Sequence, residues 1–311
     1  MQVQGDTLTV DLPAQTSYEQ PLLAIVIVSF NSRELLRACL DSLSRHPLTL
    51  GETEIHVVDN ASSDDSADMV ARDYPDVILH RLVQNSGFSV ANNVALNQTH
   101  ARYVLLLNPD TEAFDGALDH MVRLMDENPR IGMSGCRLVQ PDGTFDHAAK
   151  RSFPTPTAAL AHFTKVGRLP IASGRLAQYR APELGEHDLG PVDAVNGAFM
   201  LVRLEALQGV GLLDEAYWLY MEDLDWCYRF HQRGWDVVYD GRVQFLHVKG
   251  GSAGKHRRLR QNYAFHRGMG RFYRKFYAGE NPIVDFAVYA GVLGKFAVSA
   301  TRSAIARARL R

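Results

Sequence analysis

Asp110 and His247 have the side chains and the sequence context expected of metal ligands. Asp110 follows an apolar run in Asn108-Pro109-Asp110, where the proline fixes its own backbone and keeps the preceding residue extended. A carboxylate presented there could hold Mg²⁺ or Mn²⁺ against a diphosphate, and the alternative is an ordinary turn that contains an aspartate. His247 precedes the glycine-rich basic turn 249–252, so it could face a phosphate or a metal, or be a structural histidine at a strand end.

A run of acidic residues further along the chain could supply a general base. Glu222, Asp223 and Asp225 open an expected helix over 222–233. Acids in a first helical turn are favoured by the helix dipole alone, by about 0.3–1 kcal/mol each. In an aromatic-walled pocket, however, burial would raise the proton affinity of one acid and suit it to proton transfer. The spacing leaves both interpretations open, and the aromatic residues nearby are Tyr217, Trp218, Tyr220 and Trp226.

Alternating strands and helices are expected to position these side chains. Residues 24–30 (AIVIVSF) are a continuous apolar, β-branched run, which is typical of a strand buried on both faces. Further strands at 54–59, 77–83 and 103–108, with helices between them, predict an α/β fold with a mostly parallel sheet. Such sheets bind ligands beyond the carboxyl ends of their strands. All four ends are polar: Ser29–Asn31, Asp59–Asn60, Asn85–Phe88 and Asn108–Asp110.

The second half of the chain is less regular. Residues 145–190 show no clear periodicity and are expected to be a lid, a binding loop or a disordered segment; as a lid they could cover the acceptor or exclude water. Earlier in the chain, residues 84–93 are expected to be a loop that enters a helix. Strands are expected over 131–139, 197–203, 235–239 and 243–248.

The composition is that of a soluble globular protein. Apolar residues make up 46% and charged residues 22% of the 311 residues, which excludes a disordered chain, a collagen-like repeat and a coiled coil. Three widely separated cysteines indicate neither a disulfide framework nor a structural zinc site and favour a reducing compartment. The first twenty residues contain no Lys or Arg and no long apolar run, so we expect no secretory signal.

Common nucleotide-binding and hydrolase signatures are missing from the sequence. No GxGxxG follows the first strand, which argues against a dinucleotide dehydrogenase, and no GxxxxGK[ST] marks a P-loop phosphotransferase. The GxSxG elbow of α/β-hydrolases is absent as well. The polar residues at the strand ends are therefore the remaining indication of function in this half of the sequence.

Taken in order, these segments resemble a family 2 glycosyltransferase, with bacterial rhamnosyltransferases closest in appearance and galactofuranosyltransferases also similar. Each motif is weak alone, but the ordered set is specific, and it covers residues 24–252. The matching segments are 28–31 (VSFN), 57–64 (VVDNASSD), 85–93 (NSGFSVANN), 107–110 (LNPD), 196–200 (NGAFM), 220–226 (YMEDLDW) and His247.

This resemblance implies a GT-A fold and an inverting transfer of a sugar from a nucleoside diphosphate to a hydroxyl. It implies that Asp223 is the base, with Glu222 as the alternative, and that Asp110 and His247 ligate Mg²⁺ or Mn²⁺. Asp59 would hydrogen-bond the pyrimidine base. The implied acceptor-binding residues are Trp218, Tyr220 and Trp226, and the implied donor-binding residues are Ser29, Asn31, Asp59, Asn60, Asn85, Gly87, Phe88, Asn92, Asn108 and Asp110.

The resemblance also implies substrates. The donor would be a dTDP- or UDP-sugar, with dTDP-L-rhamnose the first expectation, and the acceptor a cell-surface glycan or a lipid-linked saccharide. Alternatives are a galactofuranosyl- or other hexosyltransferase that uses a UDP-sugar and, in another class, a non-catalytic nucleotide-sugar-binding scaffold. One departure affects the metal: the family pattern Asp-x-Asp has Asn108 in its first place here. The metal is therefore expected to bind weakly without the donor diphosphate, or to be dispensable.

The end of the chain is strongly basic. Residues 251–311 contain 13 Lys and Arg against 2 Asp and Glu, although the whole chain has a net charge of −2. A basic helix over 255–277 and an apolar one over 283–300 are expected to lie on an anionic membrane surface. The apolar segment carries Asp285 and Lys295, so we expect that it does not cross the bilayer. The alternative is that both helices pack on the catalytic domain or form a homodimer interface.

The sequence thus predicts three regions in a cytoplasmic protein that is peripheral on the inner face of the cytoplasmic membrane. They are a polar lead-in (1–20), a GT-A domain (21–252) and a basic helical tail (253–311). Within the domain, 21–115 would be the nucleotide-sugar half and 116–252 the acceptor half. The tail contains no nucleic-acid-binding motif, so no nucleic-acid partner is expected.

Overall fold

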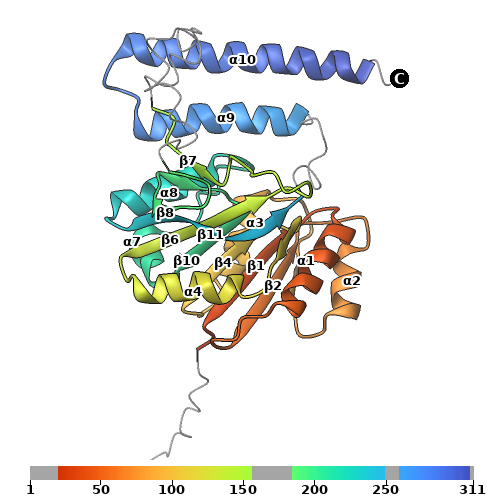
Figure 1. The fold of residues 1–311 in the computed structure, drawn as a ribbon. Coiled ribbons are helices and arrows are strands. Elements are labelled where there is room, and N and C mark those ends of the chain that lie inside the picture. The colour runs from red at the N-terminus through yellow and green to blue at the C-terminus, as the bar shows by residue number, and fades with distance from the viewer. Residues whose placement is uncertain (1–19, 156–183, 249–258, 309–311) are drawn as a thin grey trace, which may run out of the picture.

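The computed structural model describes residues 20–155, 184–248 and 259–308 (Figure 1). The predicted lead-in, most of the irregular stretch and the basic turn 249–252 lie outside these residues.

The first half of the fold consists of four parallel strands and three helices: β1 (Leu23–Ser29), α1 (Arg33–Arg45), β2 (Thr53–Asp59), α2 (Ser66–Asp73), β3 (Ile78–Arg81), α3 (Phe88–Leu96) and β4 (Tyr103–Leu107). The strands pair in the order β3-β2-β1-β4. β1 is buried along almost its whole length, as its apolar run predicts. Parallel pairing brings the carboxyl ends of these strands to one edge of the sheet.

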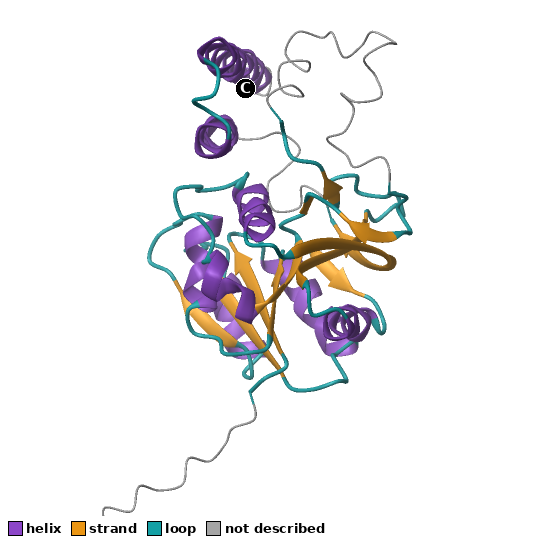
Figure 2. Ribbon diagram, turned by 90° about the vertical axis from the view of Figure 1, so that its left-hand side faces the viewer, coloured by secondary structure: helices purple, strands orange, loops and turns teal. Residues whose placement is uncertain are grey.

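The second half extends the same sheet with shorter elements: β5 (Thr111–Ala113), α4 (Ala117–Glu127), β6 (Ile131–Val139), β7 (Lys150–Arg151), β8 (Leu189–Pro191), β9 (Ala194–Val195), β10 (Phe199–Arg203), η3 (Leu204–Ala206), α7 (Leu207–Val210), α8 (Glu222–Gln232) and β11 (Asp236–His247). β10 lies antiparallel between β4 and β6, and β11 runs parallel to β6. β7 and β9 form a separate two-stranded sheet. Helices cover both faces of the main sheet (Figure 2), so the predicted α/β fold is confirmed.

Two predicted boundaries are wrong. α3 begins at Phe88, so the predicted loop over 84–93 is shorter than expected. The two strands expected at 235–239 and 243–248 are one strand, β11, whose register against β6 shifts between Asp240 and Gln244. Gly241 permits this irregularity, because a Cβ atom there would lie 2.2 Å from the carbonyl oxygen of Glu186.

Two long helices, α9 (Leu259–Phe276) and α10 (Pro282–Ala308), lie beyond the sheet, with α10 outermost (Figures 1 and 2). α9 packs on α8, where the rings of Phe276 and Tyr228 lie 4.1 Å apart. α10 packs on α9, and its Tyr289 ring meets the Tyr273 ring edge-on at 5.6 Å. Part of the tail therefore packs on the domain, as one of the two interpretations expected.

α10 is mostly exposed although it is apolar. Its segment Pro282–Thr301 is long and apolar enough to span a membrane by length and composition, with a mean hydropathy of 1.5, yet only 11% of the window is buried. Ile283, Phe286 and Leu293 have exposed fractions of 80%, 76% and 67%. α10 is therefore not a buried core helix in this structure.

Candidate active site

The ends of β1 and β2 are joined by polar contacts. Asp59, the last residue of β2, is buried, and its Oδ2 accepts a hydrogen bond of 3.1 Å from the backbone N–H of Ser62. Asn31 has φ of +51°, a left-handed conformation that asparagine tolerates, and its Oδ1 accepts a bond of 2.7 Å from the N–H of Ser63. The other oxygen of Asp59, Oδ1, is buried without a hydrogen-bond partner among the described residues. The described residues therefore leave the hydrogen-bonding capacity of that oxygen unused.

A network of amide side chains ties the end of β2 to the loop before α3. Asn60 Oδ1 accepts from the N–H of Ser86 at 2.8 Å, and its Nδ2 donates to the carbonyl of Gly87 at 3.1 Å. Asn85 Oδ1 accepts from the N–H of Gly87 at 3.1 Å. Two predicted donor-binding residues, Asn60 and Asn85, are therefore adjacent and fix the path of this loop.

Gly87 is where the two halves of the sheet domain meet. Its φ is +91°, and a Cβ atom there would lie 2.3 Å from the carbonyl oxygen of Trp218. The same carbonyl accepts a hydrogen bond of 2.8 Å from the N–H of Phe88. On the other side, the guanidinium carbon of Arg260 from α9 lies 4.0 Å from the centroid of the Trp218 ring. Trp218 thus contacts the predicted donor loop and the tail at once.

The predicted base, Asp223, lies in the first turn of α8 and forms an ion pair. Its Oδ2 lies 2.6 Å from Nη2 of Arg151 in β7 and 3.4 Å from the backbone nitrogen of Gly197. A Cβ atom on Gly197 would lie 3.6 Å from Cβ of Asp223 and 3.9 Å from Cζ of Phe88. Phe88 and Asp223, which the sequence assigns to the donor and acceptor sides, therefore both lie next to Gly197.

Glu222, the alternative base, has a different environment. It is buried, and its Oε2 has no hydrogen-bond partner within the described part of the chain. Burial, and then the neighbouring carboxylate of Asp223, raise the pKa of Glu222 well above its ordinary value. Glu222 therefore keeps its proton to a higher pH than an exposed glutamate does.

Asp110 and His247, the two predicted metal ligands, lie near each other. Nε2 of His247, at the end of β11, lies 3.6 Å from Oδ1 of Asp110. The other ring nitrogen, Nδ1, lies 3.2 Å from Oδ2 of the buried Asp146. A carboxylate on the far nitrogen is the usual partner of a metal-binding imidazole, because it fixes the tautomer and directs Nε2 to the ion.

One carboxylate and one imidazole fit a divalent cation that also binds phosphate. Mg²⁺ commonly takes one or two carboxylates from a protein and fills its other positions with water and substrate phosphates. In the described ranges, no group of three or more His, Cys, Asp or Glu side chains is arranged to hold an ion. A donor diphosphate would therefore have to complete the coordination.

Several predicted contact residues turn inward instead. Trp226 is fully buried, and its Nε1 donates to the carbonyl of Gly211, so the prediction that it contacts the acceptor is wrong. Trp226 lies on the side of α8 that packs against the core, together with the buried Cys227 and Phe230. Ser29 and Asn92 are also buried. The hydroxyl of Ser29 bonds that of Ser32, just before α1, and Asn92 donates to the carbonyl of Phe88 within α3, so both side chains make protein contacts.

Three residues of the site were not predicted from the sequence. Arg151 and Asp146 belong to a stretch with no periodicity, and a single basic or acidic residue there carries no signal. Arg260 belongs to the basic tail, where its pairing with Trp218 depends on the tertiary fold. Of the remaining predicted residues, Asn108 lies just past the end of β4, where its backbone N–H donates to the carbonyl of Ala198.

Comparisons with known proteins identify the family and the fold. The glycosyl transferase family 2 profile matches residues 24–184, more than half of the chain. The N-acetylglucosaminyl-diphospho-decaprenol L-rhamnosyltransferase of Mycobacterium tuberculosis is 29% identical over 245 residues, which span 75% of this chain and 78% of that protein. The low-salt glycan biosynthesis hexosyltransferase Agl10 of Haloferax volcanii is 27% identical over 72% of this chain and 66% of its own length.

Among solved structures, the fold is similar to that of the mannosyltransferase PcManGT from Pyrobaculum calidifontis in complex with GDP-Man and Mn²⁺. The TM-score is 0.56 at 17% identity, and the match covers 93% of this chain and 76% of that one. It is also similar to Staphylococcus aureus TarS 1–349, with a TM-score of 0.52 at 15% identity over 87% of this chain and 70% of that one. The chain has a GT-A fold and belongs to glycosyl transferase family 2.

Proposed function

We propose that this glycosyltransferase moves L-rhamnose from dTDP-L-rhamnose to a hydroxyl of a lipid-linked or cell-surface glycan, with inversion at the anomeric carbon. The observation that carries the proposal is that Phe88, from the predicted donor side, and Asp223, the predicted base, both lie next to Gly197. The choice of rhamnose draws on the rhamnosyltransferase that is 29% identical. The choice of a lipid-linked acceptor draws on the diphospho-decaprenol in the name of that relative.

The donor nucleotide would bind at the ends of β1 and β2. The buried Oδ1 of Asp59, which has no protein partner among the described residues, would accept the N3–H of the pyrimidine. Asn31, Asn60 and Asn85 would line the nucleoside and ribose. Gly87 allows the backbone to approach closely where a side chain would collide with Trp218.

Asp223 would take the proton of the acceptor hydroxyl. As that proton leaves, the acceptor oxygen bonds to the anomeric carbon on the face opposite the diphosphate. The bond between that carbon and the diphosphate oxygen breaks, and dTDP departs. Arg151 holds the carboxylate of Asp223 in place. Proton transfer by a positioned side chain contributes about 10²–10⁴-fold to the rate.

Asp110 and His247 would hold Mg²⁺ or Mn²⁺ at the donor diphosphate. When bound, the cation would offset the negative charge that develops on the leaving group. Asp146 would keep the imidazole of His247 in the tautomer that binds metal. The presence of Mn²⁺ with GDP-Man in the PcManGT structure supports the use of a divalent ion by this fold.

The tail would hold the enzyme at the inner face of the cytoplasmic membrane, where a lipid-linked acceptor is found. α9 contains five Arg and Lys residues and no acid, and α10 exposes a contiguous apolar surface. Cations near an anionic bilayer contribute about 1 kcal/mol each. The protein would therefore be cytoplasmic and peripheral.

A donor panel tests the proposal. The full-length protein is given dTDP-L-rhamnose, UDP-galactofuranose, UDP-glucose or GDP-mannose with Mn²⁺, and release of the nucleoside diphosphate is measured with Asp223→Asn as the matched control. Release from dTDP-L-rhamnose that depends on Asp223 supports the proposal. Preferential release from UDP-galactofuranose contradicts the choice of rhamnose, and donor binding without turnover on any donor would make the protein a non-catalytic scaffold.

A further inference from the structure

The ion pair between Arg151 and Asp223 is largely shielded from solvent. Nη2 of Arg151 lies 2.6 Å from Oδ2 of Asp223 and donates at the same distance to the carbonyl of Val195. The two charged side chains are only 11% and 13% exposed. Solvent and salt screen such an enclosed pair much less than a surface pair. Arg151 therefore acts on the charge of Asp223 more strongly than an exposed arginine would.

The segment that carries Arg151 is anchored independently of the ion pair. Arg151 pairs with Ala194 in the two-stranded sheet of β7 and β9. Two residues further on, the backbone N–H of Phe153 donates to Oδ2 of Asp193 at 2.8 Å. The ring centroids of Phe153 and Tyr228, which belongs to α8, lie 4.9 Å apart. The backbone of Arg151 is therefore fixed relative to the helix that carries the predicted base.

The ion pair uses one oxygen of the carboxylate. Oδ2 of Asp223 accepts from Arg151 and lies 3.4 Å from the backbone nitrogen of Gly197. Oδ1 accepts a bond of 2.8 Å from the backbone N–H of Leu224, and it has no second partner within the described residues. Because each carboxylate oxygen can accept two hydrogen bonds, Oδ1 can accept one more, from the hydroxyl of an acceptor.

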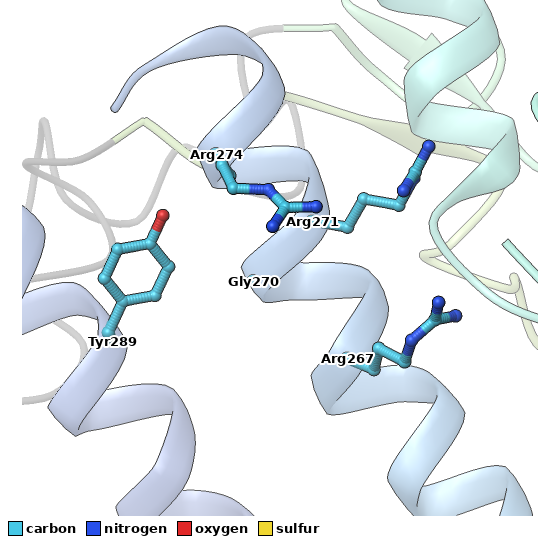
Figure 3. A pocket seen from close by; sticks show the side chains of 5 residues that line it. All are labelled: Arg267, Gly270, Arg271, Arg274 and Tyr289. Carbon is cyan, nitrogen blue, oxygen red and sulfur yellow. The ribbon is translucent and has the colours of Figure 1, made fainter. Parts of the chain in front are cut away.

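The cations of α9 pair with other acids. Figure 3 shows Arg271 turned away from α10 and toward α8, and it bonds Asp214. Lys275 of the same helix is paired with Asp214 and with Asp225 of α8. Asp225 is also paired with Arg229, four residues along α8. The charge of Asp225 is therefore balanced by cations other than Arg151.

The other titratable groups of α8 near this ion pair are Glu222, Asp225 and Cys227. Burial raises the pKa of the Cys227 thiol to about 12, so it stays uncharged near neutrality. Burial, and then Asp223, raise the pKa of Glu222, whereas Arg151 acts to lower it. Two adjacent acids therefore interact with one guanidinium, and its removal would favour the protonated form of both.

We propose that Arg151 is a positioning residue for proton transfer. It keeps Asp223 ionised beside Glu222 and holds Oδ2, so that Oδ1 receives the proton of the acceptor hydroxyl. The guanidinium keeps its own protons and contacts neither the donor nor the acceptor in this role. The inference rests on the proposed function and deepens it, because it names the residue that makes Asp223 a base.

The pH profile of transfer by the full-length protein tests this role. The kcat/KM of wild type, Arg151→Gln and Arg151→Lys is measured from about pH 4 to about pH 9 with the donor that wild type uses. In Arg151→Gln, burial and Glu222 favour the protonated carboxyl, so the acid limb should move to higher pH by about 1–3 pH units. Arg151→Lys keeps the charge and should restore the limb. Its kcat should be about 10–100-fold lower at unchanged KM, because an ammonium lacks the planar fork that fixes the carboxylate.

A matched control and a second readout accompany the profile. Arg72→Gln is the control, because Arg72 pairs with Asp73 at 2.7 Å on the exposed side of α2, and it should keep the profile of wild type. Urea unfolding of Arg151→Gln, Asp223→Asn and the double variant needs no activity. The two effects on stability should be non-additive at about pH 8, and more nearly additive at about pH 4, where carboxylates take up protons.

The outcomes separate this inference from the proposed function. An acid limb that stays in place in Arg151→Gln, with the rate lowered equally at every pH, overturns the role, and so do additive effects on stability at about pH 8. If Arg151→Gln does not fold or transfers no sugar at any pH, Arg151→Lys decides. A lower kcat at unchanged KM then supports the role, and a wild-type kcat overturns it. If wild type transfers sugar from no donor, the proposed function fails and the role fails with it, whereas an active wild type with an unmoved variant profile overturns the role of Arg151 alone.

Discussion

Nη2 of Arg151 lies 2.6 Å from Oδ2 of Asp223, and the same nitrogen donates to the carbonyl of Val195. β7 and β9 pair through Lys150 and Val195, so this small sheet holds the guanidinium against α8. The pairing keeps a negative carboxylate at the start of α8, where the helix dipole also favours it. Glu222 next to it is buried with no such partner among the described residues, so the two adjacent acids have different environments.

Asp223→Asn is expected to lower the rate of sugar transfer by about 10²–10⁴-fold and leave donor affinity nearly unchanged, because the amide keeps the shape but takes no proton. Steady-state release of nucleoside diphosphate and calorimetry with dTDP measure the two effects. Glu222→Gln is the matched control and should stay active. An inactive Glu222→Gln beside an active Asp223→Asn would move the base to Glu222.

Glu222→Gln is also expected to stabilise the protein as the pH rises. Below the pKa that Glu222 has in the unfolded chain, the carboxyl is protonated in both the folded and the unfolded state. It then does not change the free energy of unfolding with pH. Above that pKa the unfolded state ionises while burial holds the proton in the fold, because the folded pKa is raised. The free energy of unfolding then falls by about 1.4 kcal/mol per pH unit until the folded pKa is passed.

Urea unfolding of wild type and Glu222→Gln between pH 4 and pH 8 checks this, since glutamine has no proton to lose. The advantage of the variant should be small at pH 4 and larger at pH 8. A difference that stays constant across this range would mean that burial does not perturb Glu222.

Asp146→Asn is expected to weaken Mn²⁺ binding in the presence of dTDP by about 10–100-fold, because the imidazole of His247 loses its orienting carboxylate. Asp110→Asn and His247→Ala should lose more, since they would remove ligands. Calorimetry with dTDP and Mn²⁺ measures the affinities, and the exposed Asp142→Asn controls for the loss of one negative charge. Unchanged affinity and turnover in both ligand variants would remove them from the metal site.

Gly268→Ala and Gly270→Ala should have opposite effects on stability although both lie on α9. A Cβ atom on Gly268 would lie 3.0 Å from the carbonyl oxygen of Tyr220, whereas one on Gly270 meets nothing within 4 Å. Gly268→Ala should cost about 1–3 kcal/mol through overpacking, and Gly270→Ala should gain about 0.5–1 kcal/mol. Urea unfolding measures both, and a stable Gly268→Ala would show that α9 and the 220–221 turn can separate freely.

Replacing Phe286 and Leu293 by Glu should lower co-sedimentation with anionic vesicles at least tenfold, because each apolar side chain contributes about 1.5–3 kcal/mol when buried. Val83→Glu is the control, since Val83 is 99% exposed but lies away from the tail. High salt should weaken the binding of wild type. Unchanged pelleting of the double variant would assign the exposed face of α10 to another partner.

The sequence predicts most of the fold but less of the site. The run 24–30 predicts β1 because a continuous β-branched stretch suits a strand buried on both faces. It does not predict that β10 inserts antiparallel between β4 and β6, because that pairing joins distant segments. Likewise, α3 begins early because Phe88 donates to the carbonyl of Trp218, a contact that no local pattern encodes.

Single polar residues are the harder part of the site to predict. Asp110 and His247 follow strands, and the ends of strands are predictable from hydrophobic patterning. Arg151 and Asp146 follow no pattern, and only the folded chain brings them to Asp223 and His247. For Trp226 the sequence gives a signal that the structure does not bear out. Its position beside three acids indicates a pocket wall, but its side of α8 packs into the core.

The contact between α9 and the turn before α8 has a consequence for synthesis of the protein. Tyr220 and Met221 both have positive φ, at +71° and +75°, and Gly268 packs directly against them. Ribosomes make α9 after every strand of the sheet, so a nascent chain can complete the nucleotide side before this support exists. We therefore expect truncated translation products to bind nucleotide without transferring sugar, which ties activity to completion of the chain.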